Sequence, residues 1–320
     1  MDELDQKILK VMEREGFKGS NELATILGTS PRTIQRHMKK MNQEGIFKTV
    51  AVPNFPAFGF HGWARIGIKV DPKLLDNVAR ELVTNHFVYF VAYSLGYYDL
   101  IISVAMPSIE MLIYFVNYEL TNIEGITAKE TMLMVHPVKY YRYRWASPIF
   151  KKYQSALEFD APDDHPRYEA TDLDRKILQI WLDNGLIRPG IMSKKLGAPE
   201  NVVRKRMKYM RENQVVTLEV VPNKEVLEDE AWATIGVNTR HKFDNRALEL
   251  IINNPDVYLV SFCLGKFDLV IAVRFKNTER LTQFLNSELS MVEGISSFET
   301  FLHGKPLKYH NTRLGEPFRH

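Results

Sequence analysis

The sequence has one cysteine among 320 residues and a net charge of only +3. A single thiol excludes a disulfide within the chain and favours a reducing compartment. The longest apolar stretch, around residues 88–106, contains Asp99 and is too short to span a bilayer. The first ten residues are acidic and lack the apolar core of a signal peptide. We therefore expect a cytoplasmic protein with no membrane partner, and the small net charge by itself indicates no other partner.

The sequence also lacks a P-loop, a serine-hydrolase elbow and a zinc-binding pattern. The nine histidines form no HExxH motif and no close cluster with metal-ligand spacing. We interpret them, His136 and His303 included, as surface residues or as residues with satisfied hydrogen bonds. Cys263 is interpreted as a small buried residue, with a reactive thiol as the alternative. No cofactor, no metal and no catalytic residue is expected.

The sequence does contain a long internal repeat, at an offset of 169 positions. The stretch SLGYYDLIIS (94–103) returns as CLGKFDLVIA (263–272), and Trp63 returns as Trp232. The whole chain keeps this register without an insertion. Short periods indicate solenoids, but this period has the size of a domain or more. We interpret it as the duplication of a two-part module.

The first part of each module is predicted to be three short helices. The first helix has an apolar face that consists of Leu4, Ile8, Val11 and Met12. Ser20 is a candidate N-cap and Gly28 a candidate end for the second helix. Thr29 or Ser30 can cap the third helix, with Pro31 in its first turn. A tight glycine-containing turn between the last two helices is typical of a helix-turn-helix.

The third helix is the predicted DNA reader, because such a helix lies in the major groove. Ile34, Met38 and Met41 form its inward stripe. Its predicted DNA-binding residues are Ser30, Arg32, Thr33, Gln35, Arg36, Lys39 and Lys40. Arginine and glutamine suit base edges, whereas lysine suits phosphates. The alternative is an ordinary three-helix domain with a solvated basic face.

In the second copy, the third helix keeps an inward stripe that consists of Val203, Met207 and Met210. Its outward face stays basic, with Arg204, Lys205, Arg206 and Lys208. Residues 29–48 and 198–211 each hold five basic residues against one acidic residue, which favours a polyanionic partner. The predicted DNA-binding residues here are Asn201, Arg204, Lys205 and Lys208. Because these differ from the first copy, we predict two non-identical half-site readers. The weak cap at Ala198 and Pro199 leaves open whether the second one still selects sequence.

The second part of each module is predicted to be a βαββαβ domain of the ferredoxin-like type. The predicted strands are 63–70, 87–96, 97–106 and 126–141, then 232–240, 257–265, 266–275 and 295–310. The predicted helices are 71–85 and 108–123, then 243–254 and 277–289. The fold class is therefore α+β, with two winged or helix-turn-helix domains and two ferredoxin-like domains in tandem and pseudo-two-fold symmetry. The domain bounds are 1–52, 60–141, 170–221 and 230–310.

A linker is predicted over residues 142–169. Its first half mixes aromatic and basic residues, which is compatible with stacking on single-stranded nucleic acid. The other interpretation is that it continues the fourth strand and packs between the modules. Its second half is polar, acidic and contains proline, as is typical of a linker.

A Gly-x-aromatic-Asp hairpin occurs in both copies, as Gly96, Tyr97, Tyr98 and Asp99 and as Gly265, Lys266, Phe267 and Asp268. Glycine can adopt a positive φ there, and the aspartate can bond nearby backbone amides. The functional interpretation is that these eight residues bind an effector. An aspartate would pair with its amine and Lys266 with its carboxylate. Since Tyr97 corresponds to Lys266, two such sites need not bind the same ligand.

The ordered set of motifs resembles the Lrp/AsnC (leucine-responsive/asparagine-operon) regulators over nearly the whole chain. It comprises the openings LDQKILKVM and TDLDRKILQI, the stretch SPRTIQRHMKKMNQEGIF, both hairpins, the EGI loops, and the closing strands with Thr131 and Thr300. The resemblance implies a transcription regulator that binds double-stranded DNA and, near hairpin loops at subunit interfaces, a small effector that is often an amino acid. Typical members carry one copy and dimerise. One chain is therefore expected to mimic that dimer, to form homo-oligomers and to have no enzymatic activity.

Two alternatives stay open. Siroheme decarboxylases resemble this family and share both parts, so a tetrapyrrole-binding protein is the first alternative. It would need histidine or arginine around a large cleft between the modules, and no histidine repeats at the offset of 169. The second alternative is a sensor or assembly module that has lost DNA binding.

Overall fold

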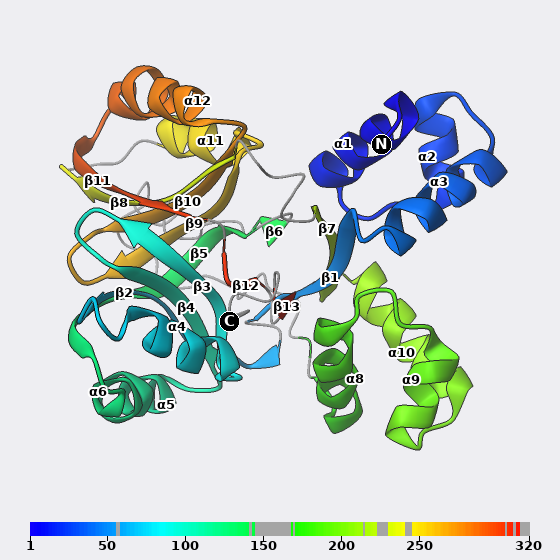
Figure 1. The fold of residues 1–320 in the computed structure, drawn as a ribbon, viewed down its shortest axis with the longest axis horizontal. Coiled ribbons are helices and arrows are strands. Elements are labelled where there is room, and N and C mark those ends of the chain that lie inside the picture. The colour runs from blue at the N-terminus through cyan, green and yellow to red at the C-terminus, as the bar shows by residue number, and fades with distance from the viewer. Residues whose placement is uncertain are drawn as a thin grey trace, which may run out of the picture. The chain divides into compact units, whose positions relative to one another are not determined.

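The chain divides into two compact units in a computed structural model. The structure describes residues 1–55, 58–140, 143–144, 168, 170–213, 215–222, 230–240, 245–304, 306–309 and 312–313. Met1–Asn54 and Glu169–Glu228 form one unit, and Phe55–Tyr168 and Asp229–His320 form the other (Figure 1). We call them the reader unit and the barrel unit. Each unit is built from both copies of the repeat. Across the described residues, no helix is both long enough and apolar enough to cross a membrane.

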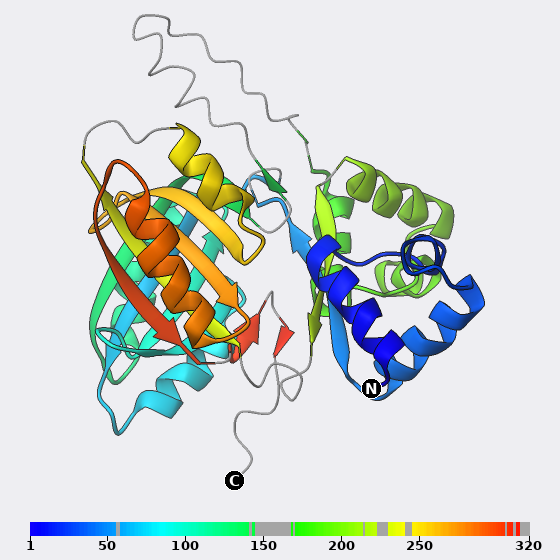
Figure 2. The same cartoon turned by 90° about the horizontal axis from the view of Figure 1, so that it is seen from above.

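The reader unit holds two helix clusters joined by a ribbon of two strands. The first copy contributes α1 (Glu3–Glu15), α2 (Ser20–Leu27), α3 (Pro31–Gln43) and β1 (Phe47–Pro53). The second copy contributes α8 (Asp172–Asp183), α9 (Pro189–Leu196), α10 (Glu200–Glu212) and β7 (Val216–Pro222). Strands β1 and β7 pair antiparallel, from Phe47 opposite Pro222 to Pro53 opposite Val216 (Figure 2). Each wing strand therefore completes the sheet with the wing of the other copy.

Local signals in the sequence explain where the reader helices begin and end. Ser30 caps α3 by accepting a 3.1 Å hydrogen bond from the Thr33 amide, and Gly28 ends α2 with a φ of 63°. These two predictions are confirmed. The prediction of Ser20 as an N-cap is wrong by one residue. Gly19 is the cap, because Glu22 in the first turn accepts a hydrogen bond from the Gly19 amide at 3.2 Å, so no cap side chain is needed.

The barrel unit contains both predicted βαββαβ domains. Copy one has β2 (Gly62–Val70), α4 (Leu75–Thr84), β3 (Val88–Leu95), β4 (Leu100–Met106), α5 (Ile109–Tyr114), a π-helical turn (Phe115–Glu119), α6 (Leu120–Asn122) and β5 (Ile126–Tyr140). Copy two has β8 (Ala231–Thr239), α11 (Asn245–Asn253), β9 (Val257–Leu264), β10 (Leu269–Phe275), α12 (Thr278–Gln283), a π-helical turn (Phe284–Glu288), a 3-10 turn (Leu289–Met291) and β11 (Ile295–His303). The strand orders β5-β2-β4-β3 and β11-β8-β10-β9 confirm the ferredoxin-like prediction.

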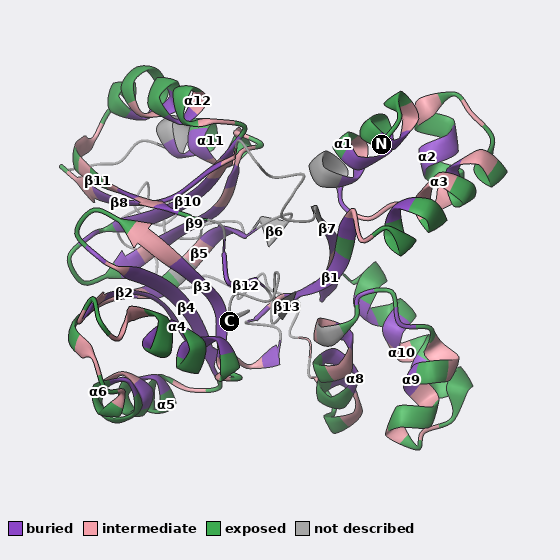
Figure 3. Ribbon diagram, viewed as in Figure 1, coloured by how far each residue is buried: buried purple, intermediate pink, exposed green. Residues whose placement is uncertain are grey.

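The two four-stranded sheets join edge to edge at both sides. Strand β5 pairs with β9, and β11 pairs with β3, so the eight strands close into a ring. Closure removes sheet edges that would otherwise bind other strands. Alternate residues of β2 face outward into the core under α4 and α5: Ala64, Ile66 and Ile68. The residues between them face the inside of the barrel. Figure 3 shows the buried strands and the exposed outer faces of the helices.

Two buried lysines, one in each copy, link the copies, because each binds the C-terminal end of a helix in the other copy. Lys139 Nζ donates to the carbonyl oxygens of Ile252 and Asn254, at 2.7 and 2.8 Å. Lys308, which lies 169 positions later, donates to the Asn85 carbonyl oxygen at 2.7 Å. A cation at these carbonyls satisfies groups that a helix C-terminus leaves unpaired. The copies are therefore interlocked by polar contacts as well as by strands.

The structure changes one predicted strand and describes little of the linker. The strand predicted over 295–310 breaks after His303, because Gly304 and Pro306 interrupt it, and resumes as β12 (Lys308–Tyr309), followed by β13 (Thr312–Arg313). Of the predicted linker, β6 (Tyr143–Arg144) folds back on β5. Residues 142, 145–167 and 169 lie outside the described residues.

Candidate DNA-binding and effector sites

The predicted DNA-binding residues of the first copy lie on the open face of α3. Ile34 and Met41 are buried in the reader core and Met38 is partly buried, as predicted. The exposed residues are Ser30, Arg32, Gln35, Arg36, Lys39 and Lys40, and Thr33 is half-buried. Gln35 donates a 3.2 Å hydrogen bond to Ser20, and Lys40 lies 3.8 Å from Asp5. Within the described residues, Arg32, Arg36 and Lys39 make no ion pair. Helix α3 therefore presents three uncompensated cations.

Three of the five basic residues of α10 pair with carboxylates, and Lys205 and Arg211 make no ion pair among the described residues. Arg204 pairs with Glu200, and Lys208 Nζ lies 3.6 Å from Glu212. The prediction that Arg206 faces outward is wrong, because it binds the buried Asp174. Of the other predicted contacts, Lys205 is exposed, and the Asn201 side chain accepts a 2.9 Å hydrogen bond from the Val202 amide. Although α3 and α10 carry similar numbers of cations, α10 presents less free positive charge.

A buried aspartate fixes the third helix to the first in each cluster. Asp5 is fully buried, accepts a 3.0 Å hydrogen bond from the Asp2 amide and lies 2.7 Å from His37 Nδ1. Burial acts to raise the pKa of Asp5, but the Asp2 and His37 hydrogen bonds outweigh it and the pKa is lowered. In the second copy Asp174 takes the place of Asp5, and Arg206 takes the place of His37. We call these the two aspartate anchors.

Histidine spacing alone does not predict the first anchor, because its partners Asp5 and His37 are 32 positions apart. Ligand atoms of Asp2, Asp5 and His37 lie within 4.8 Å of one another, which is close enough for a metal ion. The carboxylates of Asp2 and Asp5 instead accept each other's backbone amides in a capping box. The recurrence of Asp5 as Asp174 was the available signal. We interpret the cluster as structural.

The hairpin residues have structural roles that the geometry makes explicit. Gly96 and Gly265 have φ values of 114° and 139°, as expected of glycine. Asp99 accepts a 2.8 Å hydrogen bond from the Val70 amide. Asp268 accepts one of 2.7 Å from the Thr239 amide. Each aspartate therefore fastens its hairpin to the end of the neighbouring strand.

The aromatic hairpin residues Tyr98 and Phe267 are almost fully buried. Their rings lie against Gly67 and Gly236, where any side chain would collide with them. The Tyr98 hydroxyl bonds Glu130. Glu299, which corresponds to Glu130, instead pairs with Lys266 at 2.8 Å. This ion pair raises the pKa of Lys266. The equivalent glutamates Glu130 and Glu299 therefore bind different hairpin positions in the two copies, Tyr98 in the first and Lys266 in the second.

The structure brings the two hairpins together at one end of the barrel. Lys266 Nζ lies 5.1 Å from the centre of the Tyr97 ring, and Lys69 Nζ lies 5.8 Å from it. Tyr98 and Phe267 both pack on Phe301. Tyr97 is 60% exposed. The open part of this end is therefore an aromatic ring between two lysines, which we call the hairpin end.

The inside of the barrel holds a cysteine and a histidine. Burial and the nearby Asp268 raise the pKa of Cys263 to about 12, so its thiol stays protonated at neutral pH. His303 Nε2 lies 2.9 Å from the Thr234 hydroxyl. His303 Nδ1 has no partner among the described residues, which departs from the expectation of a satisfied histidine. Burial and the charge of Arg65 hold the pKa of His303 well below its usual value, so the ring is neutral.

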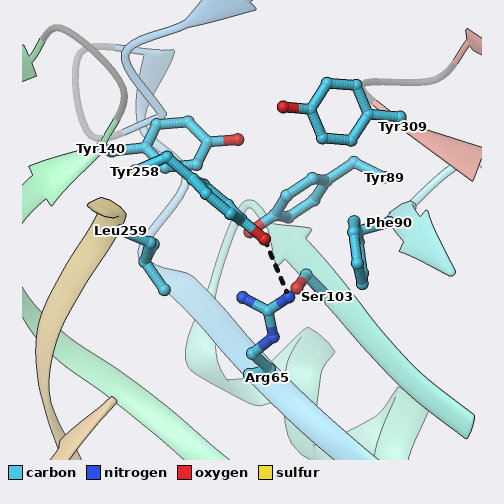
Figure 4. Close-up of a pocket in the computed structure, with 8 residues that line it drawn as sticks. All are labelled: Arg65, Tyr89, Phe90, Ser103, Tyr140, Tyr258, Leu259 and Tyr309. Carbon is cyan, nitrogen blue, oxygen red and sulfur yellow. Dashed lines mark hydrogen bonds between the residues drawn. The ribbon is translucent and has the colours of Figure 1, made fainter. Parts of the chain in front are cut away.

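A small cavity lies between aromatic residues of both copies (Figure 4). Its lining residues are Arg65, Tyr89, Phe90, Ser103, Tyr140, Tyr258, Leu259 and Tyr309. The cavity volume is about 10 Å³, which is about enough for one water molecule. Burial raises the pKa of Tyr89 to about 12. The Tyr89 hydroxyl is therefore protonated at neutral pH.

Comparisons with known proteins agree with this architecture. A family described as winged helix-turn-helix DNA-binding matches residues 1–48. The Lrp/AsnC ligand binding domain matches residues 64–143 and 233–312. An uncharacterised HTH-type transcriptional regulator of Pyrococcus furiosus is 31% identical over 44% of this chain and 95% of its own length. The regulator FL11 of the same organism is 29% identical over 42% of this chain and 89% of its own length.

Solved structures of a siroheme decarboxylase match both copies at once. The siroheme decarboxylase NirDL, in complex with an iron-uroporphyrin III analogue, aligns with a TM-score of 0.53 over 96% of this chain and 92% of that one. Its 15% sequence identity shows a shared fold alone. The family matches extend over both ligand-binding copies and the first reader domain. The chain belongs to the Lrp/AsnC family of transcriptional regulators and carries its ligand-binding domain twice.

Proposed function

We propose that this regulator reads DNA mainly through α3, and that α10 adds affinity with weaker sequence selection. The observation that carries the proposal is the contrast in ion pairing. Arg32, Arg36 and Lys39 have no carboxylate partner among the described residues, whereas Arg204 and Lys208 each have one on their own helix. A paired cation must give up its partner before it can bind phosphate or a base edge. Helix α3 can therefore bind DNA without first breaking ion pairs at these three residues.

The β1–β7 ribbon supports a further part of the proposal. It holds two reader helices within one chain, as a dimer of single-copy chains would. Because the two helices carry different side chains, the matching DNA site has two unlike halves. Such a site would not be palindromic, since palindromic operators reflect identical readers.

The test is fluorescence anisotropy on DNA from upstream of the protein's own gene and on random DNA, at several salt concentrations. We expect Arg36→Ala to lower the preference for the specific DNA by roughly tenfold, because a base contact is lost. Lys39→Ala should weaken binding to both DNAs by a similar factor and reduce the salt slope by about one.

Lys208→Ala is the matched control, because Lys208 is already paired with Glu212. It should change the affinity for either DNA much less than Lys39→Ala does. Equal losses from Lys39→Ala and Lys208→Ala would contradict the assignment of α3 as the main reader. Unchanged binding in all three variants would contradict DNA recognition by these helices.

We also propose that the small effector binds at the hairpin end. Lys69 and Lys266 offer cations to a carboxylate, Glu299 offers an acceptor to an ammonium, and Tyr97 offers an open ring face. Asp99 and Asp268 shape the loops through their amide contacts. In this proposal the protein regulates transcription and catalyses no reaction, and chains assemble into homo-oligomers.

Effector binding can be tested with the twenty amino acids in a thermal-shift assay, since a ligand that binds the folded state raises its melting temperature. For any amino acid that stabilises the protein, Lys266→Ala should weaken the affinity by about tenfold. It should change the stability of the free protein little, because a partly exposed ion pair contributes about 0–1 kcal/mol. Glu81→Ala, at an exposed position on α4, is the control. Unchanged affinity in Lys266→Ala would place the effector elsewhere.

The alternative of a tetrapyrrole-binding protein follows from the fold shared with NirDL. The cavity inside the barrel has room for about one water molecule, which is far smaller than a tetrapyrrole. A visible absorption band of the purified protein after incubation with siroheme or haem would favour this alternative. An unchanged spectrum would favour the regulator.

A further inference from the structure

A buried arginine lies at the cavity inside the barrel. Arg65 is on β2, opposite Ser103 of β4, and is 2% exposed. Its guanidinium carbon lies 4.8 Å from the centre of the Phe90 ring, and Nη2 lies 3.5 Å from the Tyr258 hydroxyl. Figure 4 shows the guanidinium reaching between Tyr258 and Ser103. The charge is therefore held inside the protein by weak contacts.

Arg65 has no anionic partner among the described residues, and its Nε atom has no hydrogen-bond acceptor. Another arginine of the same barrel does have a carboxylate partner. Arg274 of β10 forms a two-point ion pair with Glu230, at 2.6 and 2.7 Å. An unpaired buried charge costs several kcal/mol. Among the residues that the structure describes, Glu230 therefore supplies a carboxylate to Arg274, whereas no carboxylate pairs with Arg65.

Comparison of the two copies shows which cavity residues are repeated and which occur in one copy alone. Tyr89 corresponds to Tyr258 at the offset of 169, and Tyr140 corresponds to Tyr309. These tyrosines line the cavity from both copies. Arg65 corresponds instead to Thr234, and Ser103 corresponds to Ala272. The aromatic scaffold therefore belongs to both copies, whereas the cation and the serine hydroxyl belong to one.

We propose that this cavity binds one small monatomic anion, a halide such as chloride, against the Arg65 guanidinium. The hydroxyls of Ser103 and Tyr258 line the cavity. Ser103 hydrogen-bonds Tyr89, and the Tyr258 hydroxyl accepts from Arg65, so each would turn its proton toward the anion. An anion supplies the missing counter-charge, and the space for about one water molecule excludes an amino acid. The site is therefore distinct from the hairpin end. Because Arg65 belongs to the first copy and Tyr258 to the second, the anion stabilises the closed barrel.

The first test compares thermal unfolding of the full chain in sodium chloride, sodium bromide and sodium gluconate at equal ionic strength. Gluconate is too large for the cavity. We expect chloride or bromide to raise the unfolding midpoint by roughly 5 °C over gluconate, with saturation as the anion concentration increases. Chloride, the smaller halide, should give the larger shift.

Arg65→Met should abolish this shift, because it removes the charge and keeps an apolar chain of similar length. Ser103→Ala should reduce it, and Arg80→Met on the exposed face of α4 should leave it unchanged. Crystals of the unaltered protein grown in bromide should show an anomalous peak beside Arg65, which tests the site even if Arg65→Met fails to fold. Equal midpoints in all three salts, a shift that persists in Arg65→Met, or crystals without that peak would overturn the proposal.

Discussion

Replacing Gly236 with alanine is expected to lower the free energy of unfolding of the barrel unit by about 3 kcal/mol. A Cβ atom at Gly67 would lie 2.6 Å from the Tyr98 ring, and one at Gly236 would lie still closer to the Phe267 ring. Phe267 is almost fully buried and packs on Phe301, so its ring has no free space to move into. Chemical denaturation followed by tryptophan fluorescence gives the change in free energy.

Gly304→Ala is the matched control, because a Cβ atom there would have no heavy atom within 4 Å. It should change the free energy of unfolding by less than about 0.5 kcal/mol. Gly67→Ala should behave like Gly236→Ala. If Gly236→Ala proved as stable as Gly304→Ala, the close packing of the hairpin aromatic residues on the strands would be wrong.

The second large effect is expected at the aspartate anchors of the reader unit. Asp174→Ala should lower the free energy of unfolding of the second reader cluster by about 3–5 kcal/mol. The substitution removes the buried carboxylate that binds Arg206 and a capping contact at the N-terminus of α8. Asp172→Ala, at a neighbouring exposed position on α8, is the control. Differential scanning calorimetry separates the two units if they unfold in separate transitions. A loss no larger than that of Asp172→Ala would contradict the anchor.

The first anchor adds a dependence on pH. The pKa of Asp5 is lowered in the folded protein from its ordinary value of 3.8, so the folded state favours the charged carboxylate. The resulting stability is present above pH 3.8 and is lost as the pH falls through the lower, folded-state pKa. Asp5→Asn should remove this part of the acid dependence. His37→Arg should preserve the anchor, because Arg206 occupies that place in the second copy.

The two copies have diverged at the proposed ligand sites and have kept the contacts that hold the fold. Lys139 and Lys308 bind helix ends across the copies in the same way. The reader helices, the hairpin position shared by Tyr97 and Lys266, and the cavity position shared by Arg65 and Thr234 differ. A chain that joins both halves can change one half alone, which a dimer of identical chains cannot do. Duplication therefore allows an asymmetric DNA site and a single anion site.

The sequence by itself determined the repeat, the helices of the readers, the βαββαβ order and the family. These features depend on local periodicity, caps and glycines, which act over a few residues. Ser30, Gly28 and the inward stripe of Ile34 and Met41 were therefore predictable. Ser20 was misplaced by one residue because Glu22 caps the helix without a cap side chain. The break after His303 coincides with Gly304 and Pro306, which are visible in the sequence.

Only the tertiary structure decided which parts pair. It placed reader with reader and closed two sheets into one barrel, because strand edges and buried faces from distant segments must find each other. It also decided which charges are free. Arg36 and Arg204 look alike in the sequence, but Glu200 pairs with Arg204, and no carboxylate of the described chain pairs with Arg36. Arg65 reads as an ordinary polar residue of a strand. Closure of the barrel buries its charge, and the proposed anion site depends on this burial.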